Sequence, residues 1–370
     1  MLIYLGLCAV ACFAGSLLLL QAGEVSVLAG AHLVFALGIV PLIFGAITHF
    51  LPVLTRSGHA QRTVLLAPLI LQGVGLVVFL AFQGRLGAGA LHGAAASALL
   101  VAFGFAAWLV LRARRTLGKP HPGWRWYLAA VALFALALLA VPAMAVWPEA
   151  RQSLRLIHLH LNTLGFVGLT AIGTLQVLLP TVLSGPDAEA AERLRRDLRL
   201  AACGVLAAAF GAALWLPLAL LGALGLAYVA LRLARAWLRR YGRRTIVGDG
   251  AAAALGGALL GFVGLLLLGV LHACGILAGR DAVPAFIAGF LLPLVTGALS
   301  QLLPVWRWPG PRSPARERMR AALVAGGAAR AGLFLAAGGA FALGSALGFW
   351  LAAAGLLLFV AAAARAFFSR

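Results

Sequence analysis

The segment Ile157–Gly185 reads IHLHLNTLGFVGLTAIGTLQVLLPTVLSG, an apolar run with two histidines and an asparagine near its start. It is long enough to cross a bilayer as a helix. Its pattern returns in residues 31–58, AHLVFALGIVPLIFGAITHFLPVLTRSG, and in residues 283–310, VPAFIAGFLLPLVTGALSQLLPVWRWPG. All three segments contain a Leu-Pro pair near their ends. A pattern that recurs along one chain predicts an internal repeat.

Alignment of the three segments on Pro52, Pro180 and Pro304 places other residues in register. A glycine precedes each proline by seven residues and a polar residue precedes it by four, namely Gly45, Gly173 and Gly297, and Thr48, Gln176 and Ser300. Twenty residues before the proline stand His32, His160 and, in the third segment, Pro284. The prolines are 128 and 124 residues apart, so the repeat unit is about a third of the chain.

The composition is that of a polytopic membrane protein. The chain is 64% hydrophobic and 10% charged, with a mean hydropathy of +1.05, whereas soluble globular proteins are about 25% charged. A helix of about 20 apolar residues spans a hydrocarbon core of about 30 Å. Twelve such runs are expected, near residues 2–20, 28–54, 64–82, 87–111, 126–147, 156–183, 199–215, 217–237, 251–278, 283–306, 321–343 and 345–367.

These runs predict an all-α integral membrane protein of about twelve transmembrane helices, in three pseudo-symmetric four-helix units. The units are expected near residues 1–125, 126–250 and 251–370, within a single polytopic domain that covers residues 1–370. If the units surround a pseudo-threefold axis, the second, sixth and tenth helices occupy equivalent positions.

The net charge of +20 follows membrane topology and does not indicate nucleic-acid binding. Most arginines lie in alternate loops, whereas the opposite loops hold only Arg85, Arg151, Arg155 and Arg280. The positive-inside rule then places the basic loops and both termini in the cytoplasm. The expected partner is the lipid bilayer, and the expected location is a bacterial-type inner membrane.

Histidines are the residues that point to chemistry. Five of the eight are expected near the outer ends of helices, on one membrane face: His32, His92, His158, His160 and His272. A single histidine there is usually an ordinary interfacial group, but their convergence favours a functional site, because polar groups at membrane depth are costly. Imidazole is also a common ligand of copper, iron and zinc. His49 lies about 25 Å from His32 along the same helix, so the two cannot share a metal.

Spacing within the sequence HLHLN separates the two histidines. Residues two apart on a helix point about 200° apart, so His158 and His160 face different neighbours. Asn162 lies one turn from His158 and is expected to orient its ring. His160 shares its repeat register with His32, which favours these two as an inward-facing, closely approaching pair if the units surround a pseudo-threefold axis.

Several other mechanisms are disfavoured. None of the expected spans contains an aspartate or glutamate, which argues against a carboxylate-driven transporter. Walker, HExxH and serine-hydrolase motifs are also absent from the sequence. Arg330 lies near the middle of its expected span, where it requires either a buried partner or a path for its side chain to the surface.

The predicted architecture, with histidines on the helices that lead the units, resembles subunit I of the heme-copper oxidases. The run HLHLNTLGFVGLTAIGTLQVLLP is similar to short oxidase-like membrane proteins with this His-x-His-x-Asn and glycine pattern. Residues 31–58 resemble, more distantly, the AH…G…LP…TG segment of the NnrS family. The resemblance implies a protein that binds heme and/or copper in nitric oxide response, denitrification or respiratory metabolism, with a redox partner or respiratory complex.

The sequence also departs from the oxidase pattern. Catalytic oxidase subunits carry paired histidines after helix six for copper and two histidines on helix ten for heme, and neither set is found here. A complete oxygen-reducing binuclear centre is therefore not expected, and whether the chain is an enzyme stays open.

The resemblance thus implies at most one heme or copper site near the outer face. Its expected ligands are His32 and His160, followed by His158, His92 and His272. Arg151 and Arg155 are expected to pair with heme propionates, or else to be ordinary interfacial arginines. The alternative function is that of a metal-free permease or respiratory-complex assembly factor that retains the fold.

Overall fold

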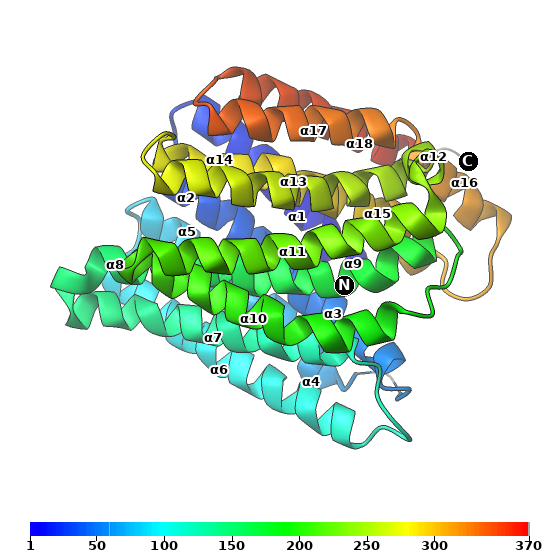
Figure 1. Cartoon of the computed structure of the whole chain (residues 1–370), viewed down its shortest axis with the longest axis horizontal. Coiled ribbons are helices and arrows are strands. Elements are labelled where there is room, and N and C mark those ends of the chain that lie inside the picture. The colour runs from blue at the N-terminus through cyan, green and yellow to red at the C-terminus, as the bar shows by residue number, and fades with distance from the viewer. Residues whose placement is uncertain (59, 369–370) are drawn as a thin grey trace. The chain divides into compact units, whose positions relative to one another are not determined.

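The computed structural model describes residues 1–58 and 60–368, and the regular structure in this part of the chain is helical (Figure 1). Within it, twelve helical segments are long and apolar enough to cross a membrane, which confirms the predicted number. They are α1 (Leu2–Gln21); α2, η1 and α3 (Val27–His32, Leu33–Ile39, Val40–Leu54); α4 and α5 (Arg62–Leu65, Ala67–Phe82); α6 (Ala88–Arg114); α7 (Gly123–Val146); η2, α8, η3 and α9 (Pro148–Ala150, Arg151–His160, Leu161–Leu169, Thr170–Val182); α10 (Ala190–Leu214); α11 (Leu216–Tyr241); α13 (Gly250–Ala273); η4, α14, η5 and α15 (Gly279–Asp281, Ala282–Phe286, Ile287–Leu291, Leu292–Arg307); α16 and α17 (Pro314–Val324, Gly327–Ala342); and α18 (Leu347–Phe368). The short helix α12 (Arg243–Gly248) connects two of them.

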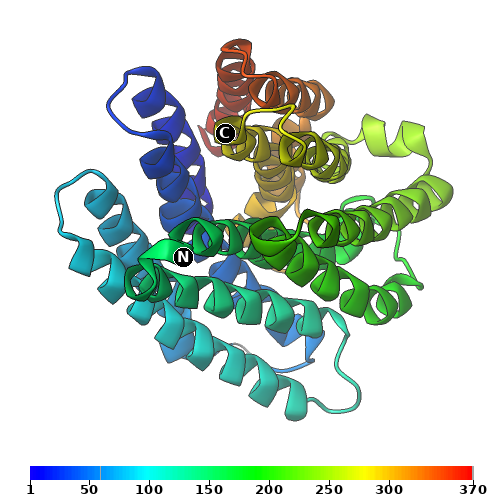
Figure 2. The same cartoon turned by 60° about the vertical axis from the view of Figure 1, so that its left-hand side comes forward.

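The chain forms two compact units. The first consists of Met1–Thr174 and Ala188–Leu226, and the second of Leu175–Asp187 and Ala227–Arg370. Within the first unit, α6, α7 and α10 lie side by side (Figures 1 and 2). Within the second, α17 and α18 pack as a pair and α17 also contacts α13. These boundaries differ from those expected for the three sequence repeats.

All three repeat segments change from α-helix to π-helix at similar places. The π-helices are η1, η3 and η5, and the first two begin at the residue that follows His32 and His160. The third begins three residues after Pro284. Because π-helices are rare, their recurrence shows that local backbone geometry follows the sequence register. Where π-helices do occur, they are often found at functional sites.

The glycines in register also make equivalent contacts. A Cβ added at each of these glycines would come closer to its neighbour than real Cβ atoms come to other atoms. The contacts are Gly45 with Leu5 of α1 (2.6 Å), Gly173 with Trp126 of α7 (2.7 Å) and Gly297 with Ala254 of α13 (2.9 Å). In every case the neighbour lies on the first helix of the predicted repeat, and the missing side chain permits the close approach.

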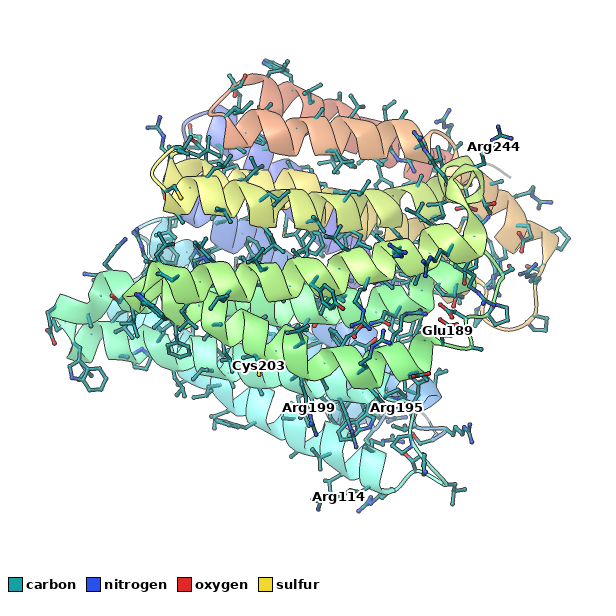
Figure 3. The ribbon with its side chains drawn as sticks, viewed as in Figure 1. Arg114, Glu189, Arg195, Arg199, Cys203 and Arg244 are labelled. Carbon is teal, nitrogen blue, oxygen red and sulfur yellow. The ribbon has the colours of Figure 1, made fainter. Side chains whose placement is uncertain are left out.

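The basic loops of the first unit meet at one of its ends. The main-chain N–H of His121 donates to the Leu54 carbonyl at 2.9 Å. The Arg112 guanidinium donates to the Ser57 hydroxyl at 3.0 Å and to the Gly58 carbonyl at 2.9 Å. Figure 3 shows Arg114 and Arg195 at this end, on α6 and α10. Loops that the charge pattern assigned to one side of the membrane therefore lie together in this unit.

His121 lies in the loop between α6 and α7. Through this residue, the stability of the folded chain is expected to depend on pH. Burial and the nearby charge of Arg195 lower the pKa of His121, whose Nδ1 accepts a hydrogen bond from the Gly123 N–H at 3.2 Å. The unfolded chain therefore takes up this proton at a higher pH than the folded chain. The contribution to stability is complete above about pH 6.5 and is lost as the pH falls below that value.

A His121→Asn variant retains a side-chain acceptor without a titrating ring. We expect its thermal unfolding temperature in detergent to fall less than that of the unsubstituted protein between pH 8 and pH 5.5. Equal falls in the two proteins would contradict this role of His121.

The eleventh span is interrupted where one continuous helix was expected. α16 ends at Val324 and α17 begins at Gly327, with Gly326 between them in the left-handed conformation, at a φ of 67°. Arg330 is buried, and its guanidinium donates to the main-chain carbonyls of Leu323 and Ala325, both at 2.6 Å. The sequence left two alternatives for this arginine, a buried partner or a path for its side chain to the surface. The structure shows a partner, which is the end of α16.

Candidate functional site

His32 and His158 are two predicted site residues that lie within electrostatic range of one another. Both belong to the first unit, His32 at the end of α2 and His158 on α8. The two rings lie close enough for their charges to interact. The His32 ring also stacks on Phe82 of α5, with ring centroids 4.3 Å apart and ring planes at 28°. One flat apolar surface therefore restricts the ring of His32.

The ring nitrogen Nδ1 faces a main-chain carbonyl in each of three histidines. The pairs are His32 with Leu28 (2.8 Å), His158 with Ala137 of α7 (2.9 Å) and His160 with Leu156 (2.8 Å). A carbonyl oxygen only accepts hydrogen bonds, so Nδ1 is the donor, and in the neutral ring Nε2 then bears the lone pair. Histidines that bind metals commonly donate their other N–H in this way, which fixes the tautomer and the ring orientation.

His32 and His160 share their local geometry as well as their register. Each ring donates to the carbonyl four residues earlier, and each residue is followed directly by a π-helix. His158 differs, because its ring reaches across to α7. This difference agrees with the expectation that His158 and His160 face different neighbours.

Asn162 does not orient the His158 ring, so that prediction is wrong. Its side-chain amide donates to the main-chain carbonyl of His158 at 2.8 Å, whereas the ring is held by Ala137. Thr163 similarly donates to the Leu159 carbonyl at 2.8 Å. Both side chains bond back along their own helix at the beginning of η3, where the regular hydrogen-bond pattern changes. Asn162 therefore supports the helix rather than the imidazole.

The remaining predicted residues have other surroundings. His272 belongs to the second unit, where its Nδ1 bonds to the Leu277 carbonyl at 2.9 Å in the loop after α13. His92 is half-buried near the beginning of α6, and Arg151 and Arg155 are exposed on α8. Both arginines therefore remain accessible to an anionic group at the membrane surface.

Phe82 and the Ala137 carbonyl are site groups that the sequence did not reveal. Phenylalanine at the end of an apolar helix and a main-chain carbonyl both occur throughout a chain of this kind, and neither has a distinctive pattern. The repeat register provided a partial signal for the site, because it singled out His32 and His160. It did not reveal that His158 would turn toward the neighbouring helix α7.

His32 and His158 have the same tautomer, with Nδ1 as the hydrogen-bond donor. Across residues 1–58 and 60–368, no group of three or more histidine, cysteine, aspartate or glutamate side chains is placed to hold a metal ion. A neutral imidazole with its proton on Nδ1 presents Nε2, which is the nitrogen that commonly binds a metal in this tautomer. No protein-family model and no curated protein matches this sequence.

Proposed function

We propose that this chain is a membrane protein that binds one heme or one copper ion through His32 and a histidine of α8. His158 is the better candidate for the second ligand, because its ring lies within electrostatic range of His32. The observation that supports the proposal is the shared tautomer of the two imidazoles, whose Nδ1 atoms are both held by carbonyls so that Nε2 bears the lone pair. His160 has the same tautomer and is the alternative second ligand.

The protein groups around the rings have defined roles in this proposal. The carbonyls of Leu28 and Ala137 keep the proton on Nδ1 and make Nε2 more basic. Phe82 limits rotation of the His32 ring and covers one of its faces. A bound heme or copper would supply one-electron chemistry or a binding position for a small molecule such as nitric oxide. Arg151 and Arg155, exposed on α8, would pair with heme propionates.

We further infer an oxidase-like arrangement in three four-helix units. The recurrent π-helices and the equivalent glycine contacts support this repeat. The charge pattern supports an inner-membrane location with both termini in the cytoplasm. In that setting the protein would act in nitric oxide response, denitrification or respiratory metabolism, together with a redox partner or respiratory complex.

One observation favours the alternative, a metal-free permease or assembly factor. Interrupted membrane helices often form the substrate site of transporters, and the eleventh span is interrupted between α16 and α17. In this chain, however, the Arg330 guanidinium already donates hydrogen bonds to two main-chain carbonyls at the interruption. We therefore favour the two-histidine site.

Histidine variants test the proposal. We expect His32→Ala and His158→Ala each to lower the heme or copper content per chain by at least about tenfold, because loss of a ligand costs more than loss of its supporting partner. The content is measured by absorption spectroscopy and elemental analysis of purified protein. His272→Ala is the matched control, because His272 also donates from Nδ1 to a carbonyl but belongs to the second unit.

His160→Ala identifies the second ligand. If His160→Ala loses the bound group and His158→Ala retains it, the second ligand is His160. Full content in both the His32 variant and a double His158→Ala and His160→Ala variant would refute the two-histidine site.

A further inference from the structure

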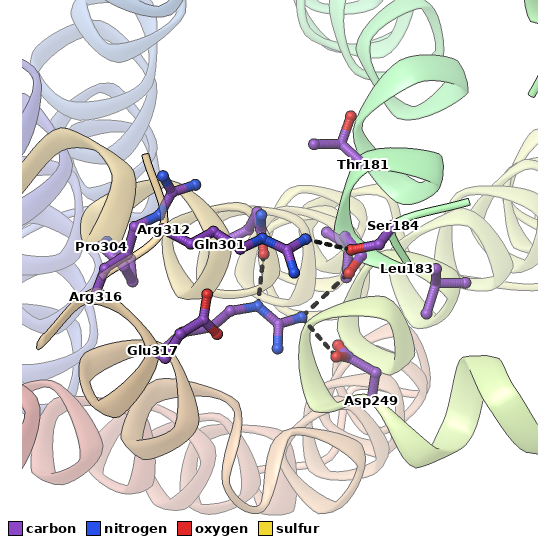
Figure 4. Close-up of a pocket in the computed structure, with 11 residues that line it drawn as sticks. Thr181, Leu183, Ser184, Asp249, Gln301, Pro304, Arg312, Arg316 and Glu317 are labelled. Carbon is purple, nitrogen blue, oxygen red and sulfur yellow. Dashed lines mark hydrogen bonds and ion pairs between the residues drawn. The ribbon is translucent and has the colours of Figure 1, made fainter. Parts of the chain in front are cut away.

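The second unit contains a polar cavity of about 220 Å³ (Figure 4). Residues from the end of α9, from α15, from α16 and the loop before it, and the residue that precedes α13 line this cavity. Its charged lining consists of Arg312, Arg316, Arg320, Asp249 and Glu317. Three arginines around one small cavity, against two carboxylates, indicate a site for an anion.

Asp249 does not oppose an anion, because its charge is already compensated. Its Oδ1 accepts the main-chain N–H groups of Ala251 and Ala252, at 2.9 and 3.0 Å, and so caps α13. Its Oδ2 accepts from the Arg320 guanidinium at 2.6 Å. Arg320 also donates from Nε to Gln301 Oε1 at 2.9 Å. Asp249, Arg320 and Gln301 therefore form a connected framework that joins α13, α15 and α16.

Arg312 and Arg316 carry positive charge that the carboxylate of this framework does not neutralise. Arg312 donates to the Ser184 hydroxyl at 2.8 Å, and Arg316 donates to the Gly310 carbonyl at 3.0 Å. Both acceptors are neutral, and each guanidinium has five N–H donors. Glu317 is the remaining carboxylate of the lining. The two arginines exceed it by one positive charge.

The cavity lies where membrane spans end. Among the elements around it, α9 ends at Val182, α13 begins at Gly250 and α15 ends at Arg307. This is the depth of lipid head groups, and basic pockets between membrane helices at this level bind anionic head groups. Guanidinium groups match phosphate oxygens with paired hydrogen bonds. The volume is below the roughly 300–1,000 Å³ of pockets for drug-sized ligands, which suits one small polar group.

We propose that this cavity binds a phosphate group, carried either by an anionic lipid or by a small soluble phosphate. Arg312 and Arg316 contact the phosphate oxygens. Arg320 fixes the position of the lining residues Asp249 and Gln301 by its hydrogen bonds to them. This site belongs to the second unit and is independent of the histidines of the first.

The test uses the full chain in detergent, titrated with short-chain phosphatidylglycerol, with phosphatidylcholine of the same chain length and with inorganic phosphate. We expect the double variant Arg312→Gln and Arg316→Gln to weaken phosphatidylglycerol or phosphate binding by at least about tenfold. The matched control is Arg239→Gln with Arg244→Gln, which removes the same charge from two exposed arginines of this unit that do not line the cavity. Glu317→Gln is expected to tighten binding by a few-fold, because it removes the opposing carboxylate.

The arms of the titration separate the two sources of phosphate. Arginine-dependent binding of phosphatidylglycerol alone identifies a lipid site, and arginine-dependent binding of inorganic phosphate identifies a soluble ligand; either result supports the proposal. Two results overturn it: unchanged binding of both probes by the Arg312 and Arg316 double variant, or an equal loss in the control. Arg312 is exposed, and it takes no part in the bond between Arg320 and Asp249. The single Arg312→Gln variant therefore tests binding without disturbing the Asp249 framework.

Discussion

Replacement of Arg330 by methionine is expected to destabilise the folded chain by about 1–3 kcal/mol, because it removes the donor to two main-chain carbonyls, one of them on the buried Leu323. The guanidinium serves the carbonyls of Leu323 and Ala325 at the end of α16. Leu323 retains a weak donor in the Ser300 hydroxyl at 3.3 Å, whereas Ala325 is exposed to solvent. Methionine preserves most of the apolar bulk, so the loss reports the polar contacts of the guanidinium, which are these hydrogen bonds and its position 5.7 Å from the centroid of the Phe359 ring.

The measurement is denaturant or thermal unfolding in detergent, with Arg318→Met as the matched control. Arg318 lies on α16 and is exposed, so the same chemical change there is expected to cost less than about 0.5 kcal/mol. If both variants unfold under the same conditions, Arg330 does not stabilise the interruption between α16 and α17.

Substitution of Gly261 by alanine is the second large effect, with an expected loss of about 1–3 kcal/mol or more. A Cβ at Gly261 would overlap the Gly289 carbonyl oxygen, which belongs to η5. The obstacle is main chain, so a side-chain rotation cannot relieve it. Either α13 or η5 must move, and both are tightly packed.

Gly264 supplies the control on the same helix. A Cβ there meets nothing within 4 Å, so Gly264→Ala should be neutral or should stabilise the chain by up to about 1 kcal/mol through helix propensity. Opposite signs for the two variants in thermal unfolding would establish that the Gly261 contact is specific. Equal changes would show that the close approach is not important for stability.

The helix inventory could be predicted because it depends on length and hydropathy, which are local properties. The breaks near Leu216 and Gly344 were found without any charged residue to mark them, and the structure has an extended residue at Trp215 and a left-handed glycine at Gly344. Such features follow from residue type and position alone.

Details that depend on neighbouring helices could not be predicted. The ring of His158 turns to a carbonyl of α7, and periodicity within its own helix contains no information on that partner. α10 begins at Ala190, well before the expected residue 199, because its charged first turns extend the helix beyond the apolar run; Arg193 pairs there with Glu189, four residues earlier, at 3.7 Å. The interruption after α16 had a signal in the adjacent pair Gly326 and Gly327, which hydropathy alone does not register.

The π-helices could be predicted in part. Their recurrence follows the same register as His32 and His160, so the sequence predicted equivalent positions without predicting the kind of helix. Side-chain bonds from Asn162 and Thr163 accompany the change in the second segment, but no rule for residue type would have placed it there.

The most direct test of the two-histidine site is the absorption spectrum and copper content of the unsubstituted protein. The protein is expressed with heme precursors and copper supplied, and is purified in detergent. The proposal predicts either a Soret band that corresponds to about one heme per chain or about one copper ion per chain. Purified, folded protein that is colourless and free of copper would contradict it and would favour the metal-free permease or assembly factor.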